Sequence, residues 1–213
     1  MPIATQGSGT FTPAPAGTHL ARCVGVISLG TQPANSPQFK PSFKVMLVWE
    51  LPDEMVPEKN VAMTVNREYS CFLSEKANLR HDLESWRGRP FTKEELDGFD
   101  VANVIDAPCM VSVIHKTSAK KSIYAQVTGV MQLPKGVTPK PRVNELVRYE
   151  IEQGRDTTFN SLPKWIQDKI ASCQEWQQRQ PANPADIAQS NTPDDPGDFI
   201  PEEAPSFDPE VGF

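Results

Sequence analysis

The stretch SFKVMLVWEL, residues 42–51, decides the fold class. Its bulkiest apolar side chains share one parity: Phe43, Val45, Leu47, Trp49 and Leu51. The other parity is more mixed, so the stretch has the period of 2 that is expected of a strand with one buried face. We therefore predict a strand over 42–51, and this parity favours core positions for Phe43 and Trp49.

Strands are also predicted on both sides of this stretch. Residues 18–29 are dense in β-branched and apolar side chains, and they stop at Gly30 before a turn-rich segment. Residues 61–72 alternate again, with a polar end at Arg67 and Tyr69. The first 72 residues therefore predict three strands in succession.

A helix is predicted next, over residues 75–86. Ser74 is an acceptable N-cap, Gly88 ends the pattern, and three large apolar residues lie at helical spacing: Leu79, Leu83 and Trp86. A capping-box pattern, Thr92 followed three residues later by Glu95, predicts a further short helix.

Two more strands, over 108–116 and 122–133, are predicted to form a hairpin through the polar loop 117–121. Three strands, a helix and two strands is the order of the OB-fold, a five-stranded Greek-key barrel with a helix between its third and fourth strands. The predicted fold class is therefore mainly β, as an OB-fold barrel. Other small barrels and α+β folds share this element order.

The predicted barrel is one of four parts of the chain. Residues 1–16 are expected to be a flexible arm, 17–136 the barrel, 137–180 a helical extension and 181–213 a disordered tail with seven prolines. The extension is predicted to hold a short helix over 144–153, and a second helix is marked by four apolar residues: Leu162, Ile166, Ile170 and Cys173. The sequence leaves open whether these helices pack on the barrel.

Charge is distributed unevenly along the chain. Eight of its 27 acidic residues and none of its 21 Lys and Arg follow residue 180. The remainder carries 21 basic against 19 acidic side chains, a net charge of +2, although the whole chain carries -6. A mildly basic body is compatible with a nucleic-acid partner.

Membrane and export signals are not evident in the sequence. No run of 18 apolar residues occurs, and the N-terminal segment MPIATQGSGTFTPAPAGTH lacks the basic start and apolar centre of a signal peptide. A cytoplasmic protein without a membrane partner is expected.

The cysteines are spread along the chain: Cys23, Cys71, Cys109 and Cys173. They form no CxxC pair and lack the close spacing of a disulfide framework, so we expect reduced and mostly buried thiols. A metal site that combines them with His19, His81 or His115 is the alternative. Scattered single ligands are more often core residues, so no metal is expected.

Catalytic motifs are not found either. The sequence contains no GxxxxGK[ST], GxSxG or HExxH pattern. The acidic run over 94–100 would suit metal-dependent catalysis, but charged residues at a helix start usually form a solvated face. We therefore expect a binding protein with no catalytic step and no cofactor.

Cations and aromatic side chains are interleaved in the predicted barrel, as binding of single-stranded DNA requires. The candidate DNA-binding residues are Arg22, Phe39, Lys40, Phe43, Lys44, Arg67, Tyr69, Lys116, Lys120, Lys121 and Tyr124. Tyr124 lies on an otherwise polar parity, so it is either a base-stacking residue on the wet face or a half-buried residue at the barrel edge. The three lysines of the hairpin loop are either phosphate contacts or simply solvated.

The tail alternates acids with phenylalanines. A purely solvating tail has no need of Phe199, Phe207 and Phe213, so a partner-docking peptide is favoured over a solubility tail. The candidate partner-binding residues are Asp194, Asp195, Asp198, Phe199, Phe207 and Phe213.

Several stretches together carry a resemblance to a known family: PAGTHLARCVGVISLGTQ, FKVMLVWEL, REYSCFLSEKANLRHDLESWRGRPFT, IYAQVTGVMQLPKG and LPKWIQDKI. They cover about residues 11 to 175. The chain resembles the phage-encoded OB-fold single-stranded DNA-binding proteins of tailed-phage replication modules. That group has Gly where this chain has Asp106, which puts the turn before residues 107–111 in doubt.

The resemblance implies a protein that coats and protects single-stranded DNA without strong sequence preference, in the cytoplasm of an infected bacterium. It also implies some binding of duplex DNA and recruitment of phage or host replication and recombination proteins through the acidic tail. The alternative is a replisome or recombination adaptor whose barrel binds protein, and a nuclease is a third reading. The oligomeric state is left open.

Overall fold

A mainly antiparallel β-sheet forms the framework of the protein. The computed structural model describes residues 12–34, 40–57, 59–118 and 121–179. Its strands are β1 (Gly17–Gln32), β2 (Ser42–Met55), β3 (Ala62–Ser70), β4 (Pro108–Thr117), β5 (Ile123–Met131) and β6 (Val147–Tyr149). Five of them lie in the order β3-β2-β1-β4-β5 with antiparallel neighbours, and β6 pairs parallel to β1. The five predicted strands are confirmed.

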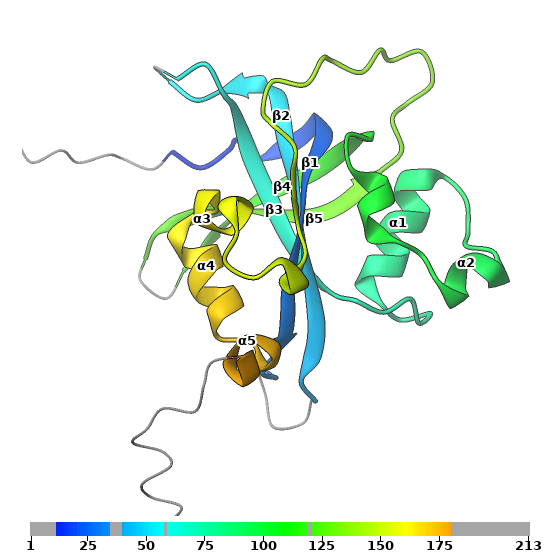
Figure 1. The fold of residues 1–213 in the computed structure, drawn as a ribbon. Helices are drawn as coiled ribbons and strands as arrows, with labels where there is room; N and C mark the ends of the chain where they lie inside the picture. The colour runs from blue at the N-terminus through cyan, green and yellow to red at the C-terminus, as the bar shows by residue number, and fades with distance from the viewer. Residues whose placement is uncertain (1–11, 35–39, 58, 119–120, 180–213) are drawn as a thin grey trace, which may run out of the picture. The chain divides into compact units, whose positions relative to one another are not determined.

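Helices lie on both sides of this sheet (Figure 1). The α-helices are α1 (Asn78–Arg87), α2 (Lys93–Asp97), α3 (Thr157–Ser161), α4 (Lys164–Ala171) and α5 (Gln174–Arg179), and two short 3-10 helices are η1 (Val101–Val104) and η2 (Ile151–Gln153). Figure 1 shows α1 and α2 on one side of the strands and α3 to α5 on the other. None of the described helices is long and apolar enough to cross a membrane.

The first core lies between the sheet and α1. Leu79, Leu83 and Trp86 of α1 are buried there, as the helical spacing predicts. Trp86 meets Trp49 of β2 with ring centroids 6.1 Å apart, and its indole N–H donates to the Pro108 carbonyl at 2.9 Å. The helix therefore joins the start of β4 to the middle of β2.

The second core covers the other face of β1 and β2. Met46 of β2 and Leu29 of β1 are fully buried there against apolar side chains of η2 and α3 to α5, including Ile151, Ile166 and Ile170. The prediction of one buried face for residues 42–51 is therefore wrong, because the C-terminal helices bury the second parity as well. Trp49 is in the core as predicted, whereas Phe43, at the strand start, is exposed.

The ends of α1 and α2 test the predicted caps. α1 begins at Asn78 with no side-chain cap, and not after Ser74 as predicted; Ser74 instead accepts a turn hydrogen bond from the Ala77 amide. The helix ends at Gly88 in the left-handed region, where glycine carries no Cβ penalty. The predicted capping box of Thr92 and Glu95 is confirmed at α2.

The segment after β5 belongs to the same compact unit as the sheet. The described residues up to Arg179 cluster as one unit, which continues across the predicted boundary at residue 136. The predicted helix over 144–153 is wrong, because β6 and η2 occupy that stretch. The second predicted helix is confirmed as α4 with Ile166 and Ile170 buried.

A buried carboxylate fixes this segment to the sheet. Glu50 of β2 is 0% exposed and accepts hydrogen bonds from the Val143 and Asn144 amides, the shorter of them 2.7 Å long. The Asn144 side chain pairs with both the N–H and the carbonyl of Ala62 at the start of β3. Buried charge needs such partners, so the connector and the sheet stabilise each other.

The predicted flexible arm ends earlier than residue 16. Ala14 is buried in the first core, and its carbonyl lies 2.9 Å from Nε2 of His115 on β4. The arm is therefore attached to the sheet from Ala14 onward.

Candidate nucleic-acid interface

The outer face of the β4–β5 hairpin carries the best-exposed candidates. Lys116 of β4 lies directly opposite Tyr124 of β5 in the antiparallel ladder, and Ile114 lies opposite Gln126. Residues directly opposite each other in a ladder point to the same face. Tyr124 is 41% exposed, so part of its ring is accessible to solvent. Lysine and an aromatic ring therefore stand side by side on an uncovered part of the sheet.

The hairpin turn adds a further cation to this face of the molecule. Lys121 is exposed and takes a positive φ of 62°, and Ser118 accepts its amide hydrogen bond at 2.9 Å. The side chains of Ser118 and Ser122 lie 2.6 Å apart across the turn. Lys120, a third candidate, lies outside the described residues. The backbone of the turn thus places Lys121 at the end of the hairpin.

The lysine and arginine candidates differ in whether they form ion pairs within the fold. Among the described residues, no acidic side chain comes within ion-pair distance of Lys40, Lys44, Lys116 or Lys121. Both arginine candidates are engaged in ion pairs with acids of the fold. The lysines are therefore available to phosphates, whereas the arginines are not.

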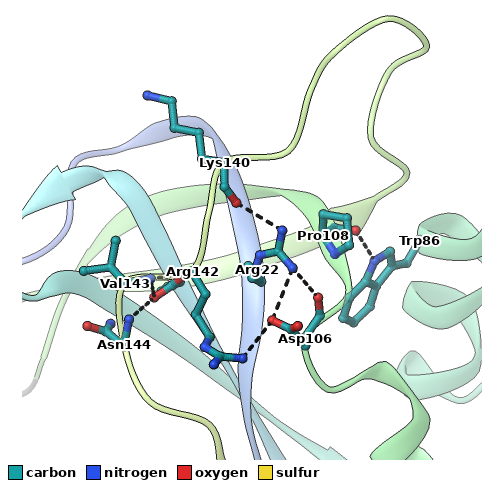
Figure 2. Close-up of polar contacts among 9 residues, drawn as sticks. Arg22, Trp86, Asp106, Pro108, Lys140, Arg142, Val143 and Asn144 are labelled. Atoms are coloured by element: carbon teal, nitrogen blue, oxygen red, sulfur yellow. Dashed lines mark hydrogen bonds and ion pairs between the residues drawn. The ribbon is translucent and has the colours of Figure 1, made fainter.

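Arg22 is a structural residue (Figure 2). Its guanidinium donates to the Asp106 carbonyl at 2.7 Å and to the Lys140 carbonyl at 3.1 Å, and it lies 3.2 Å from the Asp106 carboxylate. Arg142 approaches the same carboxylate at 3.3 Å. These three acceptor atoms of Asp106 and Lys140 hold the Arg22 side chain against the fold, which favours a structural role over the predicted DNA contact.

The turn that the resemblance put in doubt is formed by Asp106 itself. Asp106 adopts a φ of 64°, a left-handed conformation that glycine takes without a Cβ penalty. Its amide donates to the Cys23 carbonyl at 2.8 Å, and the Cys23 amide donates to Ala107 at 3.1 Å. Aspartate tolerates this region better than most residues, and its carboxylate gains Arg22 and Arg142 as partners.

Tyr69 and Arg67 are also removed from the predicted DNA site. Tyr69 is 2% exposed, and its hydroxyl donates to Asp82 of α1 at 2.7 Å. Burial, together with the Asp82 carboxylate, raises the pKa of Tyr69. Arg67 pairs with the same carboxylate at 2.8 Å and lies over the Tyr69 ring at 5.2 Å. Neither can offer its face to a base, because both fix α1 to β3.

The remaining candidates of the first loop and the second strand differ in their exposure to solvent. Lys40 and Phe43 are exposed, and Lys44 is half-buried. Phe39 lies outside the described residues. The same holds for all six partner-binding candidates of the tail: Asp194, Asp195, Asp198, Phe199, Phe207 and Phe213.

A pocket beside Lys44 brings in residues that the sequence reading did not select. It has a volume of about 280 Å³ and is lined by Lys44, Glu68, Tyr69, Ser70, Phe72, Lys76, Ala77 and Asn78. Phe72 is 50% exposed, and Lys76 is exposed without a described acidic partner. In the sequence, the sign of this pocket is Phe72 and Lys76 just before the predicted helix, in a segment that has neither strand nor helix periodicity.

Metal ligands do not gather in the part of the chain that the structure describes: no group of three His, Cys, Asp or Glu side chains there could hold an ion. The cysteines are free thiols, and three of the four are buried. Burial raises the pKa of Cys23 to about 12 and that of Cys109 well above its usual value, so both are protonated at neutral pH. Buried protonated thiols of this kind are packing residues.

Comparison with known proteins gave no match, either among protein-family models or among curated proteins.

Proposed function

We propose that this chain is an OB-fold protein that binds single-stranded DNA without strong sequence preference. The connectivity supports the fold assignment: β1 lies between β2 and β4, and β3 approaches β5 at the far ends of the sheet order. The α1 helix follows β3 in the chain and packs on both β3 and β5. A partly open Greek-key barrel with a helix between its third and fourth strands has this arrangement.

One observation carries the functional proposal: Lys116 and Tyr124 face solvent as cross-strand neighbours. A phosphate contact and a base-stacking ring are needed together, because single-stranded DNA offers a charged backbone and unpaired bases. Lysine contributes charge without the planar geometry that reads base edges, so this pair supports binding without sequence preference. No catalytic step, cofactor or metal is part of the proposal.

The biological setting follows from the resemblance stated above. We place the protein in the replication or recombination module of a tailed phage, acting in the cytoplasm of the infected bacterium, where it coats and protects single strands. Phage or host replication and recombination proteins would dock on the acidic, phenylalanine-containing tail. Duplex DNA is a weaker ligand in this proposal, because its paired bases offer no faces to Tyr124.

Fluorescence anisotropy of a labelled oligo(dT) tests the proposal with the full-length chain. Affinity should fall steeply with salt, and Lys116→Ala should lower the slope of log K against log salt concentration by about 0.7, the value for one phosphate contact on a single strand. Tyr124→Ala should weaken binding by about 5- to 150-fold, which corresponds to one lost base stack. Lys93→Ala, at an exposed lysine of α2, is the matched control and should change neither quantity.

A negative result has to exclude competition between the tail and DNA. Because an acidic tail can compete with DNA, the titration is repeated with a chain that ends after Arg179. Absence of binding by both forms at low salt would overturn the proposal.

A second candidate is supported by the apolar residues of the same hairpin. Ile123 is 55% exposed, and Ile114 and Met131 are also exposed, as a protein-docking surface would need. In that case the barrel of a replisome or recombination adaptor binds protein. Capture of a replication protein that survives Lys116→Ala and Lys121→Ala but is lost with Ile123→Ala would favour the adaptor.

A further inference from the structure

The pocket beside Lys44 has the charge of a phosphate site. Lys44 and Lys76 line it against one carboxylate, Glu68, so the lining is net positive. Among the described acids none forms an ion pair with either lysine. Phe72 lines the same pocket and is half exposed, so an aromatic face lies within reach of anything bound there.

The α4 helix is joined to one residue that lines this pocket. Lys169 reaches from α4 to the Glu68 carboxylate of β3, across 101 residues of sequence. Lys44 faces the same side of the sheet as Glu68. In the ladder between β2 and β3, Lys44 pairs with Ser70 and Met46 pairs with Glu68, and ladder partners point to the same face, as do residues two apart on one strand. The pocket and the helix thus meet at Glu68.

Trp165 extends the same helix face. It lies four residues before Lys169, and residues four apart are neighbours on the surface of a helix. Ile166 and Ile170 anchor α4 in the second core, and this orientation leaves Trp165 50% exposed. The exposed indole therefore offers a stacking face on the same side of α4 as Lys169.

We propose that a single-stranded nucleic acid crosses the outer edge of β3 between the Lys44 pocket and α4. Phosphates contact Lys44 and Lys76, and also Lys169 once a phosphate displaces Glu68 from it, and unpaired bases stack on Phe72 and Trp165. The inference deepens the proposed function and rests on it, because it makes the C-terminal helices part of the DNA path. Aromatic rings separated by cations suit a polynucleotide better than a protein, whose binding sites centre on a contiguous apolar cluster.

Glu68 has a defined part in this path. Its carboxylate occupies Lys169 and lines the pocket, so an incoming phosphate competes with it and is repelled by it. Glu68→Gln should therefore raise the affinity for oligo(dT) about 2- to 3-fold at low salt, and the gain should fade as salt screens the charges. Glu145→Gln, at an exposed acid far along the connector, is the matched control and should leave affinity within the error of the measurement.

Tryptophan fluorescence tests the path directly in the full chain. Trp49, Trp86 and Trp176 are at most 6% exposed, so Trp165 is the tryptophan that a stacked base can quench. Titration with unlabelled oligo(dT) should quench the emission, and Trp165→Phe should keep binding while losing most of the quench. Trp165→Ala should weaken binding about 5-fold or more. Lys164→Ala, next to it on α4 and highly exposed, should change affinity by less than 2-fold.

Anisotropy of a labelled strand, measured in parallel, separates the two proposals. If the strand binds but emission does not change and Trp165→Ala binds equally well, the path across β3 is overturned while single-strand binding stands. Equal quenching by a blunt duplex would also overturn it, because paired bases cannot stack on Trp165. If a strand binds neither to the full chain nor to the chain that ends after Arg179, the proposed function itself fails.

Discussion

The outer surface of the sheet has a covered half and an open half. Over the end of β1 and the start of β2, the outward residues are large and apolar, such as Leu29 and Met46, and the C-terminal helices bury them. Over β4 and β5 the outward residues include Ser112, Lys116 and Gln126, and no described helix covers them. The outward residues of the sheet therefore differ between the half that the C-terminal helices cover and the half that they leave exposed.

Breaking the covered half should have the largest effect on stability. Ile170→Ala removes a fully buried side chain from the second core and should lower the free energy of unfolding by about 2 to 5 kcal/mol. Ile114→Ala makes the same chemical change on the open half and should cost less than about 0.5 kcal/mol. Urea unfolding of both variants measures the difference, and equal losses would mean that the helices do not hold the sheet.

The attachment of the connector should give the next largest effect. Glu50→Ala leaves the Val143 and Asn144 amides without their acceptor and should cost about 1 to 3 kcal/mol. Asp53→Ala, on the same strand, removes an exposed pair with Lys140 and should cost less than about 0.5 kcal/mol. Thermal or urea unfolding compares the two, and a Glu50→Ala variant as stable as the parent would contradict a structural role for the connector.

The Asp106 turn, where Arg22 and Arg142 meet, should give an effect of intermediate size. Asp106→Gly and Asp106→Ala both remove the carboxylate, but only alanine keeps a Cβ at a φ of 64°. The alanine variant should therefore be less stable than the glycine variant by about 1 kcal/mol. Urea midpoints at equal m-values measure it, and no difference would mean that the turn relaxes.

The smallest effect on stability is expected at the open half itself. Tyr124→Ala and Lys116→Ala remove an exposed cross-strand pair, so each should change the free energy of unfolding by less than about 0.5 kcal/mol. This result, checked by urea unfolding, is what allows a loss of DNA affinity in the same variants to be assigned to binding. A large destabilisation would instead place Tyr124 among the residues that hold the sheet together.

The sequence predicted best where a local pattern decides the structure. Alternation located β2 and β3, and runs of β-branched and apolar residues bounded by turn signals located β1, β4 and β5. Helical spacing located the buried residues of α1 and α4, and the Thr92 capping box was readable without any tertiary information. These features depend on neighbours within about one turn or one strand.

The sequence predicted poorly where a residue far away in the chain determines the environment of a side chain. In the sequence, Tyr69 belongs to a polar strand end that is expected to face solvent. In the structure its side chain is buried, and its hydroxyl donates a hydrogen bond to Asp82 of α1. The sequence gives no sign of a partner for Arg22, whereas in the structure its guanidinium donates to the Asp106 and Lys140 carbonyls. Residues 147–149 are too few to show a period, so β6 was missed. Met46 and Val48 did signal the second buried face of β2, although the more polar Lys44 and Glu50 on the same parity masked them.

The parallel pairing of β6 has a consequence for how the chain can be shortened. The edge of β1 opposite β2 is shared, because β4 pairs with Gly17–Arg22 and β6 pairs with Gly25–Ile27. A polypeptide that stops at Gly136 would lose β6 and leave that stretch of β1 with unused amides and carbonyls. Bare strand edges recruit other strands, so such a fragment should self-associate and scatter light. Its aggregation would reflect the cut and not the native assembly.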